Sequence, residues 1–176
     1  SVVNKRLYVG KRCSEAMTMA YDLLLGGDVR SVRIFITYGE LMRQDDGRAI
    51  PNFVSQALTG CDLTVYGDGS QTRSICHYSD LLAGIYKLML SDVNTPVNIG
   101  NPYEITMLDL AKNIVAMTGS KSNIAFHELP RSHGHDPKVR LPDITRARTL
   151  LDWEPKVGPD EGLRRTIEWF KKELEK

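Results

Sequence analysis

The chain has 176 residues, enough for one domain or for one lobe of a larger enzyme. Hydrophobic residues make up 41% and charged residues 26%, as in soluble globular proteins, and a formal net charge of +1 gives no global attraction to nucleic acid or an anionic membrane. No apolar run approaches the roughly 20 residues of a membrane span, and Ser1–Arg6 lacks the apolar core of a signal peptide. We therefore expect a cytoplasmic protein without nucleic-acid or membrane partners.

The cysteines and histidines predict neither a disulfide scaffold nor a metal site. Cys13, Cys61 and Cys76 are odd in number and none belongs to a C-x-x-C pair, so buried free thiols are expected. His133 and His135 share one loop. Two ligands are too few for a typical zinc site, and solvated histidines are the favoured interpretation.

The first predicted helix runs from Lys11 to about Leu25 and has one apolar face, which needs a partner surface to be stable. The residues of this face are Cys13, Ala16, Met17, Ala20, Tyr21 and Leu24. Tyr8 and Lys11 stand three residues apart at its start, on roughly the same side of a helix. An ammonium favours a nearby phenolate, which can remove a proton from a substrate alcohol. Taken alone, the pair is better explained by a boundary tyrosine and a solvated lysine.

The next segments predict the end of an α/β sheet. Gly26 and Gly27 stop the first helix, and residues 29–35 read as a strand. A polar, turn-rich loop at residues 37–48 follows at the carboxyl end of that strand, where ligands bind in open α/β sheets. Pro51 can then open a helix that ends at Gly60.

The remaining chain predicts short strands alternating with helices. Strands are expected near residues 63–65, 74–78, 97–100 and 123–126, with a hairpin turn at Gly67–Gly69. A helix at residues 80–90 has Asp80 as its predicted N-cap, and Thr106 with Asp109 resembles the capping box of a helix ending at Gly119. Residues 130–142 read as an exposed loop, before two closing helices at residues 144–151 and 160–174.

The sequence contains no G-x-G-x-x-G run. A dinucleotide site of the usual kind needs a strand, a glycine-rich turn and a helix N-terminus to receive the pyrophosphate. Nothing in this chain supplies that combination.

A collinear set of motifs resembles the second half of the extended short-chain dehydrogenases, most closely the UDP-glucuronate decarboxylases. The matching stretches are GKRCSEAMTMAY, VRIFITYG, DDGRAIPNF, LTVYGDGSQTRS, PVNIGNP, DPKVRLPDITRAR and WEPKVGPDEGLRRTIEWF. The resemblance implies an α/β fold in which residues 1–60 form the C-terminal part of a Rossmann-type parallel sheet. Residues 61–176 would then form a small α/β lobe that binds a UDP-sugar.

The resemblance also implies a lyase of the epimerase/dehydratase family, which converts UDP-glucuronate to UDP-xylose and commonly dimerises. In that family NAD oxidises the sugar at C4, the β-keto acid loses carbon dioxide, and the reduced cofactor returns its hydride. The cofactor implied is NAD, and the implied partners are a UDP-sugar and a second subunit.

Residue by residue, the resemblance assigns Tyr8 and Lys11 to catalysis. Lys11 would also hold the nicotinamide ribose, and Thr37 and Arg48 would lie in the loop that touches cofactor and substrate. The implied UDP-sugar contacts are Tyr21, Asn52, Arg73 and Arg140, the arginines being suited to a diphosphate. The ordinary alternatives are a core tyrosine, a helix-start asparagine and solvated arginines.

Several positions depart from the family pattern. The family tyrosine lies four residues before the lysine, where this chain has Leu7, and the asparagine expected after RIF is Ile36. Glu40 replaces a proline, an acid that would oppose an anionic substrate, and His77-Tyr78 replaces an aromatic–valine pair. Two hypotheses follow. The chain is a UDP-glucuronate decarboxylase that is inactive in isolation, or it is an inert relative that binds a UDP-sugar or pairs with a full-length subunit.

Overall fold

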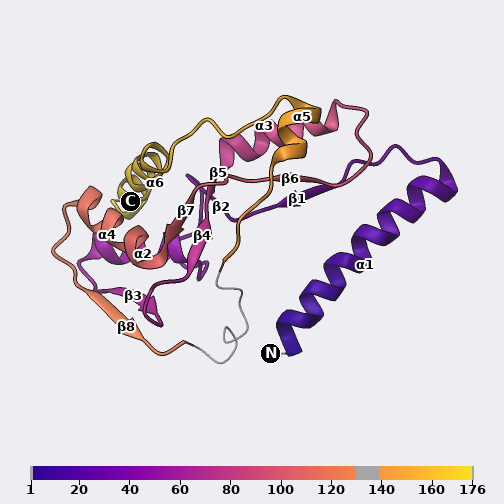
Figure 1. Ribbon diagram of the computed structural model, residues 1–176. Helices are drawn as coiled ribbons and strands as arrows, with labels where there is room; N and C mark the ends of the chain where they lie inside the picture. The colour runs from indigo at the N-terminus through magenta and orange to yellow at the C-terminus, as the bar shows by residue number, and fades with distance from the viewer. Residues whose placement is uncertain (1, 130–138, 176) are drawn as a thin grey trace.

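Helices and short strands alternate along the chain (Figure 1). The computed structural model describes residues 2–129 and 139–175, with side chains from residue 9 onward. The helices are α1 (Val2–Leu25), α2 (Ala49–Thr59), α3 (Tyr78–Met89), α4 (Met107–Thr118), α5 (Thr145–Leu151) and α6 (Pro159–Leu174). The strands are β1 (Val32–Ile34), β2 (Thr37–Tyr38), β3 (Leu63–Tyr66), β4 (Thr72–Ser74), β5 (Cys76–His77), β6 (Val97–Ile99), β7 (Glu104–Thr106) and β8 (Ile124–His127).

The described strands pair two by two. β1 with β6, β2 with β5 and β3 with β8 are parallel, whereas β4 and β7 are antiparallel. Two of the parallel pairs join a strand before residue 60 to a strand after it. The two predicted regions therefore share strand pairs, and the division of the chain at residue 60 stays a prediction.

The predicted strand at residues 29–35 is instead two short strands with different partners. The amide of Phe35 still donates to Ile99 of β6 (3.2 Å), but the carbonyl of Ile36 already accepts from Cys76 of β5 (2.9 Å). The prediction that residues 37–48 are entirely loop was therefore wrong at Thr37 and Tyr38. The physical reason is burial, because Val32 packs on one hydrophobic core and Tyr38 is buried in the other.

The larger core lies between α2, α4, α6 and strands β2 and β3, and includes Tyr38, Phe53, Leu63, Leu110 and Phe170. Local signals explain its helices. Buried residues of α2 recur at helical spacing, and the helix ends at Gly60 in the left-handed conformation (φ 74°). The N-cap half of the predicted capping box is confirmed, since the Thr106 hydroxyl accepts from the backbone amide of Asp109 (2.9 Å) before α4.

The smaller core joins α3 and α5 to strands β1 and β6 and includes Leu88, Ile99, Ala147 and Trp153. The predicted N-cap of its first helix was wrong. α3 begins at Tyr78, two residues earlier than expected, and the ring of His77 caps it while Asp80 lies in the first turn. An imidazole nitrogen accepts the amide hydrogen bond that a carboxylate was expected to accept.

Two other local predictions also needed correction. Residues 67–69 do not close a hairpin, because β3 pairs with β8 whereas β4 pairs with β7. Of the three cysteines, Cys76 is buried but Cys13 and Cys61 are exposed, so only one of the free thiols lies in the core. Most of the predicted 130–142 loop, with His133 and His135, lies outside the described residues.

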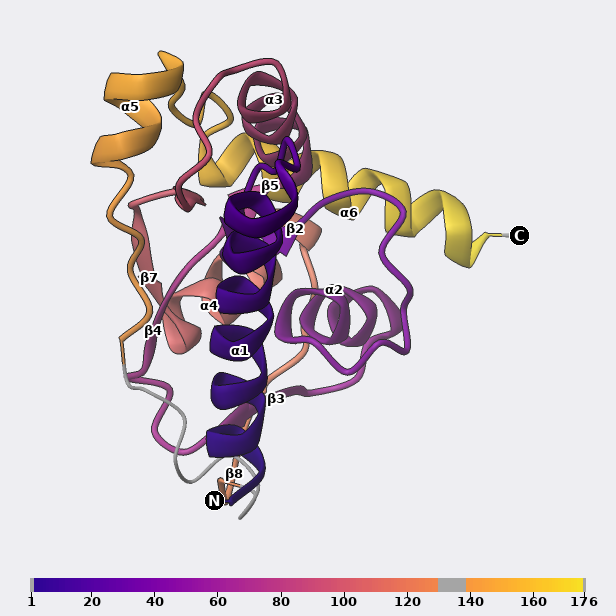
Figure 2. The ribbon, with the colours of Figure 1, turned by 90° about the vertical axis from the view of Figure 1, so that its right-hand side faces the viewer.

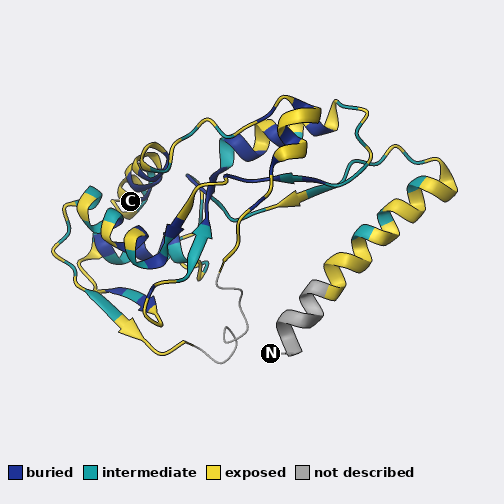
Figure 3. Ribbon diagram, in the orientation of Figure 1, coloured by how far each residue is buried: buried dark blue, intermediate teal, exposed yellow. Residues whose placement is uncertain are grey.

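Helix α1 stands apart from both cores. It is separated from the other elements in Figure 1 and lies in front of them in Figure 2, and the part of it that Figure 3 colours by burial is almost entirely exposed. None of residues 9–25 is buried, and the apolar side chains of Met17, Tyr21 and Leu24 are more than half exposed. A bidentate ion pair ties it to the body, because the Arg33 guanidinium of β1 donates to both oxygens of Glu15. The helix also begins at Val2, since a single internal glycine at position 10 does not break it.

No helix within the described part of the chain combines the length and the apolar character needed to span a lipid bilayer.

Candidate functional site

The carboxyl ends of β2 and β5 bring a set of polar and aromatic side chains together at the boundary of the two cores. Tyr38 and His77 are register partners at these ends, and their rings meet edge to face with centroids 5.6 Å apart. Both side chains are almost completely buried, at 2% and 1% exposure. The carboxyl edge of parallel strands is where α/β proteins commonly bind ligands.

His77 links the two segments that leave these strands. Its Nδ1 atom lies 2.8 Å from the Ser79 hydroxyl and accepts from the Ser79 amide (3.4 Å) at the start of α3. Its Nε2 atom lies 3.0 Å from the Glu40 carboxylate, on the loop that follows β2. Because Nδ1 accepts a backbone hydrogen bond, neutral His77 carries its proton on Nε2 and donates it to Glu40.

Tyr38 and Cys76 are held in their protonated forms. Burial is the main cause that raises the pKa of the Tyr38 phenol, and nearby acidic groups add to it. Burial, followed by the Asp80 carboxylate, raises the pKa of the Cys76 thiol to about 12. The Tyr38 hydroxyl donates to the carbonyl of Pro159 (3.3 Å). This tyrosine is therefore an anchor between β2 and α6 and is unsuited to act as a base.

Asp80 fastens the segment between α5 and α6 to the start of α3. Its carbonyl accepts from the Trp153 indole (3.1 Å), and its carboxylate accepts from the amide of Val157 (2.8 Å). Asp80 is 6% exposed, so both bonds are shielded from water. The start of α3 is thus fixed by Asp80 on one side and by His77 on the other.

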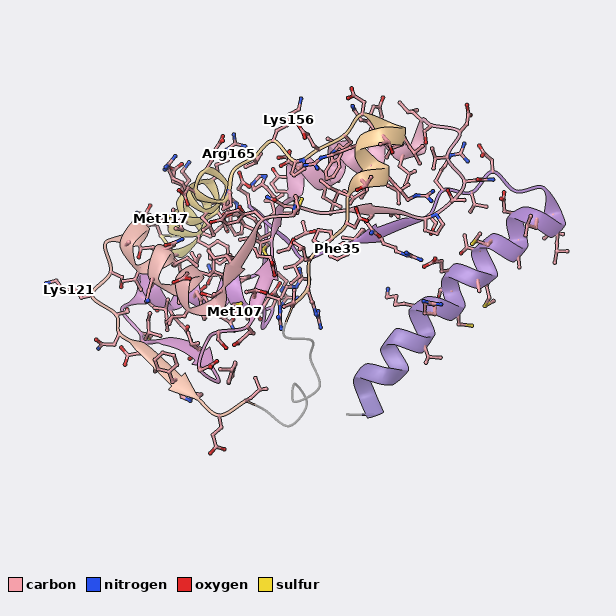
Figure 4. All side chains as sticks on the ribbon, viewed as in Figure 1. Phe35, Met107, Met117, Lys121, Lys156 and Arg165 are labelled. Carbon is pink, nitrogen blue, oxygen red and sulfur yellow. The ribbon has the colours of Figure 1, made fainter. Side chains whose placement is uncertain are left out.

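Three predicted residues lie in β2 or between β2 and the first turn of α2. Thr37 is in β2, and its hydroxyl donates to the carbonyl of Phe35 (3.0 Å), a residue labelled in Figure 4. Arg48 is the residue before α2; its side chain is 65% exposed and pairs with Asp46 (3.3 Å). Asn52 lies one turn further on, and its backbone amide donates to the backbone carbonyl of Arg48 (3.1 Å). The structure thus brings Arg48 and Asn52 together at the first turn of α2.

The two predicted phosphate-binding arginines lie on other segments. Arg73 is half-buried in β4, opposite Ile105, and its guanidinium donates to the carbonyl of Thr72 (2.7 Å). Arg140 is exposed on the segment that leads to α5. That segment is attached to β6, because the Asn98 amide donates to the carbonyl of Asp143 (2.9 Å).

The predicted residues of the first helix are separated from the others. Lys11 and Tyr21 are exposed on α1, and the side chain of Tyr8 lies outside the described side chains. Tyr21 turns back toward Gly27, where an added Cβ would lie 2.8 Å from its ring. Helix α1, which carries Lys11, is separated from the packed body in Figure 1 and contributes no residue to either core, whereas Thr37 and Arg48 belong to the body.

Two surface hollows lie elsewhere. One of about 420 Å³ lies between α3 and α5, lined by residues that include Tyr86, Leu90 and Leu150. Another of about 210 Å³ lies beside the start of α6 and includes Tyr103 and Asp160. Neither is lined by a predicted site residue. Within the described residues, no group of three or more potential metal ligands is present.

Sequence reasoning missed the contact between Glu40 and His77. Both positions depart from the family pattern, but 37 residues separate them in the chain. Their proximity follows only from the parallel pairing of β2 with β5. The available signal was that Glu40 closely follows one short strand and His77 ends another.

The family comparison decides the relationship of this chain to known proteins. Residues 8–166 match the GDP-mannose 4,6 dehydratase family. The chain belongs to this family. The predicted membership of the extended short-chain dehydrogenases is thereby confirmed.

Family members of known name and structure show the same relationship. UDP-glucuronic acid decarboxylase 1 of Danio rerio is 49% identical over 166 residues, which are 94% of this chain and 39% of that protein. UDP-glucose 4-epimerase of Thermotoga maritima, solved with UDP-glucose, has a TM-score of 0.89 at 25% identity and aligns over 94% of this chain and 53% of its own. UDP-glucuronic acid 4-epimerase of Bacillus cereus, solved with UDP-glucuronic acid and NAD, has a TM-score of 0.84 at 26% identity, over 93% and 52%.

These likenesses confirm the predicted fold class, an α/β structure with Rossmann-type parallel pairing. The chain spans about two fifths of the length of the Danio rerio relative and about half of each solved structure.

Proposed function

We propose that this chain is the sugar-nucleotide-binding portion of a UDP-glucuronate decarboxylase, which converts UDP-glucuronate to UDP-xylose with NAD. The observation that carries the proposal is the 49% identity to UDP-glucuronic acid decarboxylase 1 of Danio rerio across 94% of this chain. The fold likeness to an epimerase solved with UDP-glucuronic acid and NAD supports the same substrate class and cofactor.

The proposed ligand contacts are divided by chemistry. Arg73 and Arg140 would bind the diphosphate, because a guanidinium is permanently charged and offers paired donors to phosphate oxygens. Arg48 and Asn52, at the first turn of α2, would contact the remainder of the UDP-sugar or the adjacent cofactor. Tyr21 is proposed as a further contact and would require α1 to be held against the body.

The residues of this chain do not by themselves fit NAD. Of the residues proposed to hold it, Lys11 lies on α1, the Thr37 hydroxyl donates to the carbonyl of Phe35, and Arg48 pairs with Asp46. The sequence has no G-x-G-x-x-G run to receive a pyrophosphate at a helix N-terminus. We therefore assign no step through NAD to this chain and expect the isolated polypeptide to be inactive.

The exposure of α1 favours a second candidate function, an inert relative that acts through pairing. The apolar side chains of Met17, Tyr21 and Leu24 face solvent along a helix that packs on neither core. Such a helix gains stability by covering that face. In this candidate, α1 pairs the chain with a second copy or a full-length subunit, and UDP-sugar binding is retained without turnover.

Calorimetric titration of the purified chain with UDP-glucuronate tests the proposed function. We expect saturable binding that weakens at least about tenfold in Arg73→Ala, since a charge-assisted hydrogen bond is worth roughly 1.5–3 kcal/mol. Arg165→Ala is the matched control, because it removes an exposed arginine of α6 (Figure 4) that pairs with Glu161.

A folded chain that binds no UDP-glucuronate would contradict the proposed function. Equal weakening in both variants would contradict the role of Arg73. Chromatography of the same mixtures with added NAD tests inactivity, and formation of UDP-xylose by the isolated chain would refute that expectation.

A further inference from the structure

Glu40 lies at the edge where β2 and β5 end, and its carboxylate is within hydrogen-bond distance of His77. It lies two residues beyond β2, and its oxygen is 3.0 Å from Nε2 of His77, the last residue of β5. The Glu40 side chain is 24% exposed, whereas that of His77 is 1% exposed. The pair therefore joins a loop at the surface to an imidazole fixed inside the molecule.

His77 is a rigid point of attachment. Its Nδ1 side is occupied by the hydroxyl and amide of Ser79, at the first turn of α3. Its ring lies between Tyr38 at 5.6 Å and Tyr78 at 4.8 Å, measured between centroids. With one nitrogen and both aromatic neighbours fixed, Nε2 has one direction in which to donate, and Glu40 lies there.

The loop held in this way leads directly to the proposed ligand contacts. Gly39 opens it at φ 149°, and an added Cβ there would lie 3.3 Å from Nε2 of His77 and would clash with Cδ1 of the Tyr78 ring. Residues 40–47 then run to Arg48, the residue that precedes α2. A fixed start at residues 39 and 40 limits the course of the loop and with it the position of the first turn of α2.

We propose that Glu40 and His77 are positioning residues that restrain the 39–48 loop and so orient Arg48 and Asn52 toward a bound UDP-sugar. The hydrogen bond from Nε2 of His77 to the Glu40 carboxylate restrains the start of this loop. The part that concerns the ligand rests on the proposed function. It differs from the expectation drawn from sequence, in which the Glu40 charge opposes an anionic substrate.

Restraint of the 39–48 loop by Glu40 and His77 is tested without ligand, by amide hydrogen exchange and by nitrogen NMR of the His77 ring. We expect residues 39–48 to exchange faster in Glu40→Ala than in the wild type, and Glu40→Gln to restore most of the protection because an amide oxygen still accepts from Nε2. The NMR spectrum should show the proton on Nε2 in the wild type. Asp45→Asn is the matched control, as it removes one exposed carboxylate of the same loop that pairs only with Arg43 in the described structure.

Unchanged exchange in Glu40→Ala, or a His77 proton on Nδ1, would overturn the proposal that Glu40 and His77 restrain the loop. Equal acceleration in Asp45→Asn would also overturn it, because loss of any loop charge would then suffice.

The consequence for the ligand is tested by calorimetric titration with UDP-glucuronate. Positioning predicts roughly five- to tenfold weaker binding in Glu40→Ala, and binding within about twofold of the wild type in Glu40→Gln and Asp45→Asn. Tighter binding in both Glu40 variants would instead support direct repulsion of the ligand and overturn the proposal. Unchanged binding in Glu40→Ala would overturn it as well. A folded wild-type chain that binds no UDP-glucuronate would contradict the proposed function. The exchange experiment would then test separately whether Glu40 and His77 restrain the loop.

Discussion

Individual residues at the boundary of the two cores have environments that their neighbours in the chain do not reveal. Glu40 follows a glycine in a polar loop, yet its carboxylate is bonded to a buried histidine. Cys76 stands between Ile75 and His77 and is 1% exposed, whereas the other two thiols, which were also expected to be buried, are exposed. In both cases the pairing of β2 with β5 sets the environment, because it carries residues 37–40 against residues 76–79.

The three thiols should therefore differ sharply in reactivity. We expect iodoacetamide at pH 8 to label the exposed Cys13 and Cys61 in the folded chain but to spare Cys76. Burial raises the pKa of the Cys76 thiol to about 12, and the thiolate is the reactive form. Peptide mass spectrometry before and after unfolding in urea measures this difference. Labelling of Cys76 in the folded chain at the rate of the other two thiols would show that its environment is not the buried one described.

Helices of the body follow local signals, but their close contacts depend on partners from elsewhere in the chain. In α6, Pro159 at the first turn and buried Leu163, Ile167 and Phe170 at helical spacing explain where the helix forms and which face it buries. Gly162 of the same helix has a different reason. An added Cβ there would lie 2.9 Å from Cζ of Tyr38 and closer still to its hydroxyl oxygen.

Replacing Gly162 should consequently destabilise the protein although alanine is a better helix former. We expect Gly162→Ala to lower the free energy of unfolding by about 1–3 kcal/mol, because the buried Tyr38 ring cannot move aside without straining the core. Gly10→Ala is the matched control, since this helical glycine has nothing within 4 Å of its added Cβ. Urea denaturation followed by circular dichroism gives both values. Equal stability of the two variants would contradict a close approach of Tyr38 to α6.

At the scale of the whole molecule, the packed body and α1 differ in how they are supported. The body has two hydrophobic cores, whereas α1 contributes no buried residue from position 9 onward. Apart from its covalent link, the principal attachment described for α1 is the ion pair of Glu15 with Arg33. An exposed ion pair contributes at most about 1 kcal/mol, so helix propensity alone must sustain most of α1.

We thus expect the amides of residues 12–25 to exchange with deuterium much faster than those of α4 and α6. Hydrogen exchange followed by mass spectrometry, on a sample whose monomeric state is established by sedimentation, measures the comparison. Protection of α1 equal to that of α6 in a monomer would contradict its isolation from the body. Protection that appears only as the protein concentration rises would support the proposed pairing through α1.

The sequence by itself determined the elements whose signals are local: α2 up to Gly60, the Thr106 N-cap of α4, and the apolar face of α6. It also determined the family, because the motifs and their order along the chain can be recognised from the sequence alone. Only the tertiary structure decided that one predicted strand divides between two partners and that Glu40 meets His77. Local periodicity reports the neighbours of a residue within a few positions, whereas strand pairing and shared burial join residues tens of positions apart.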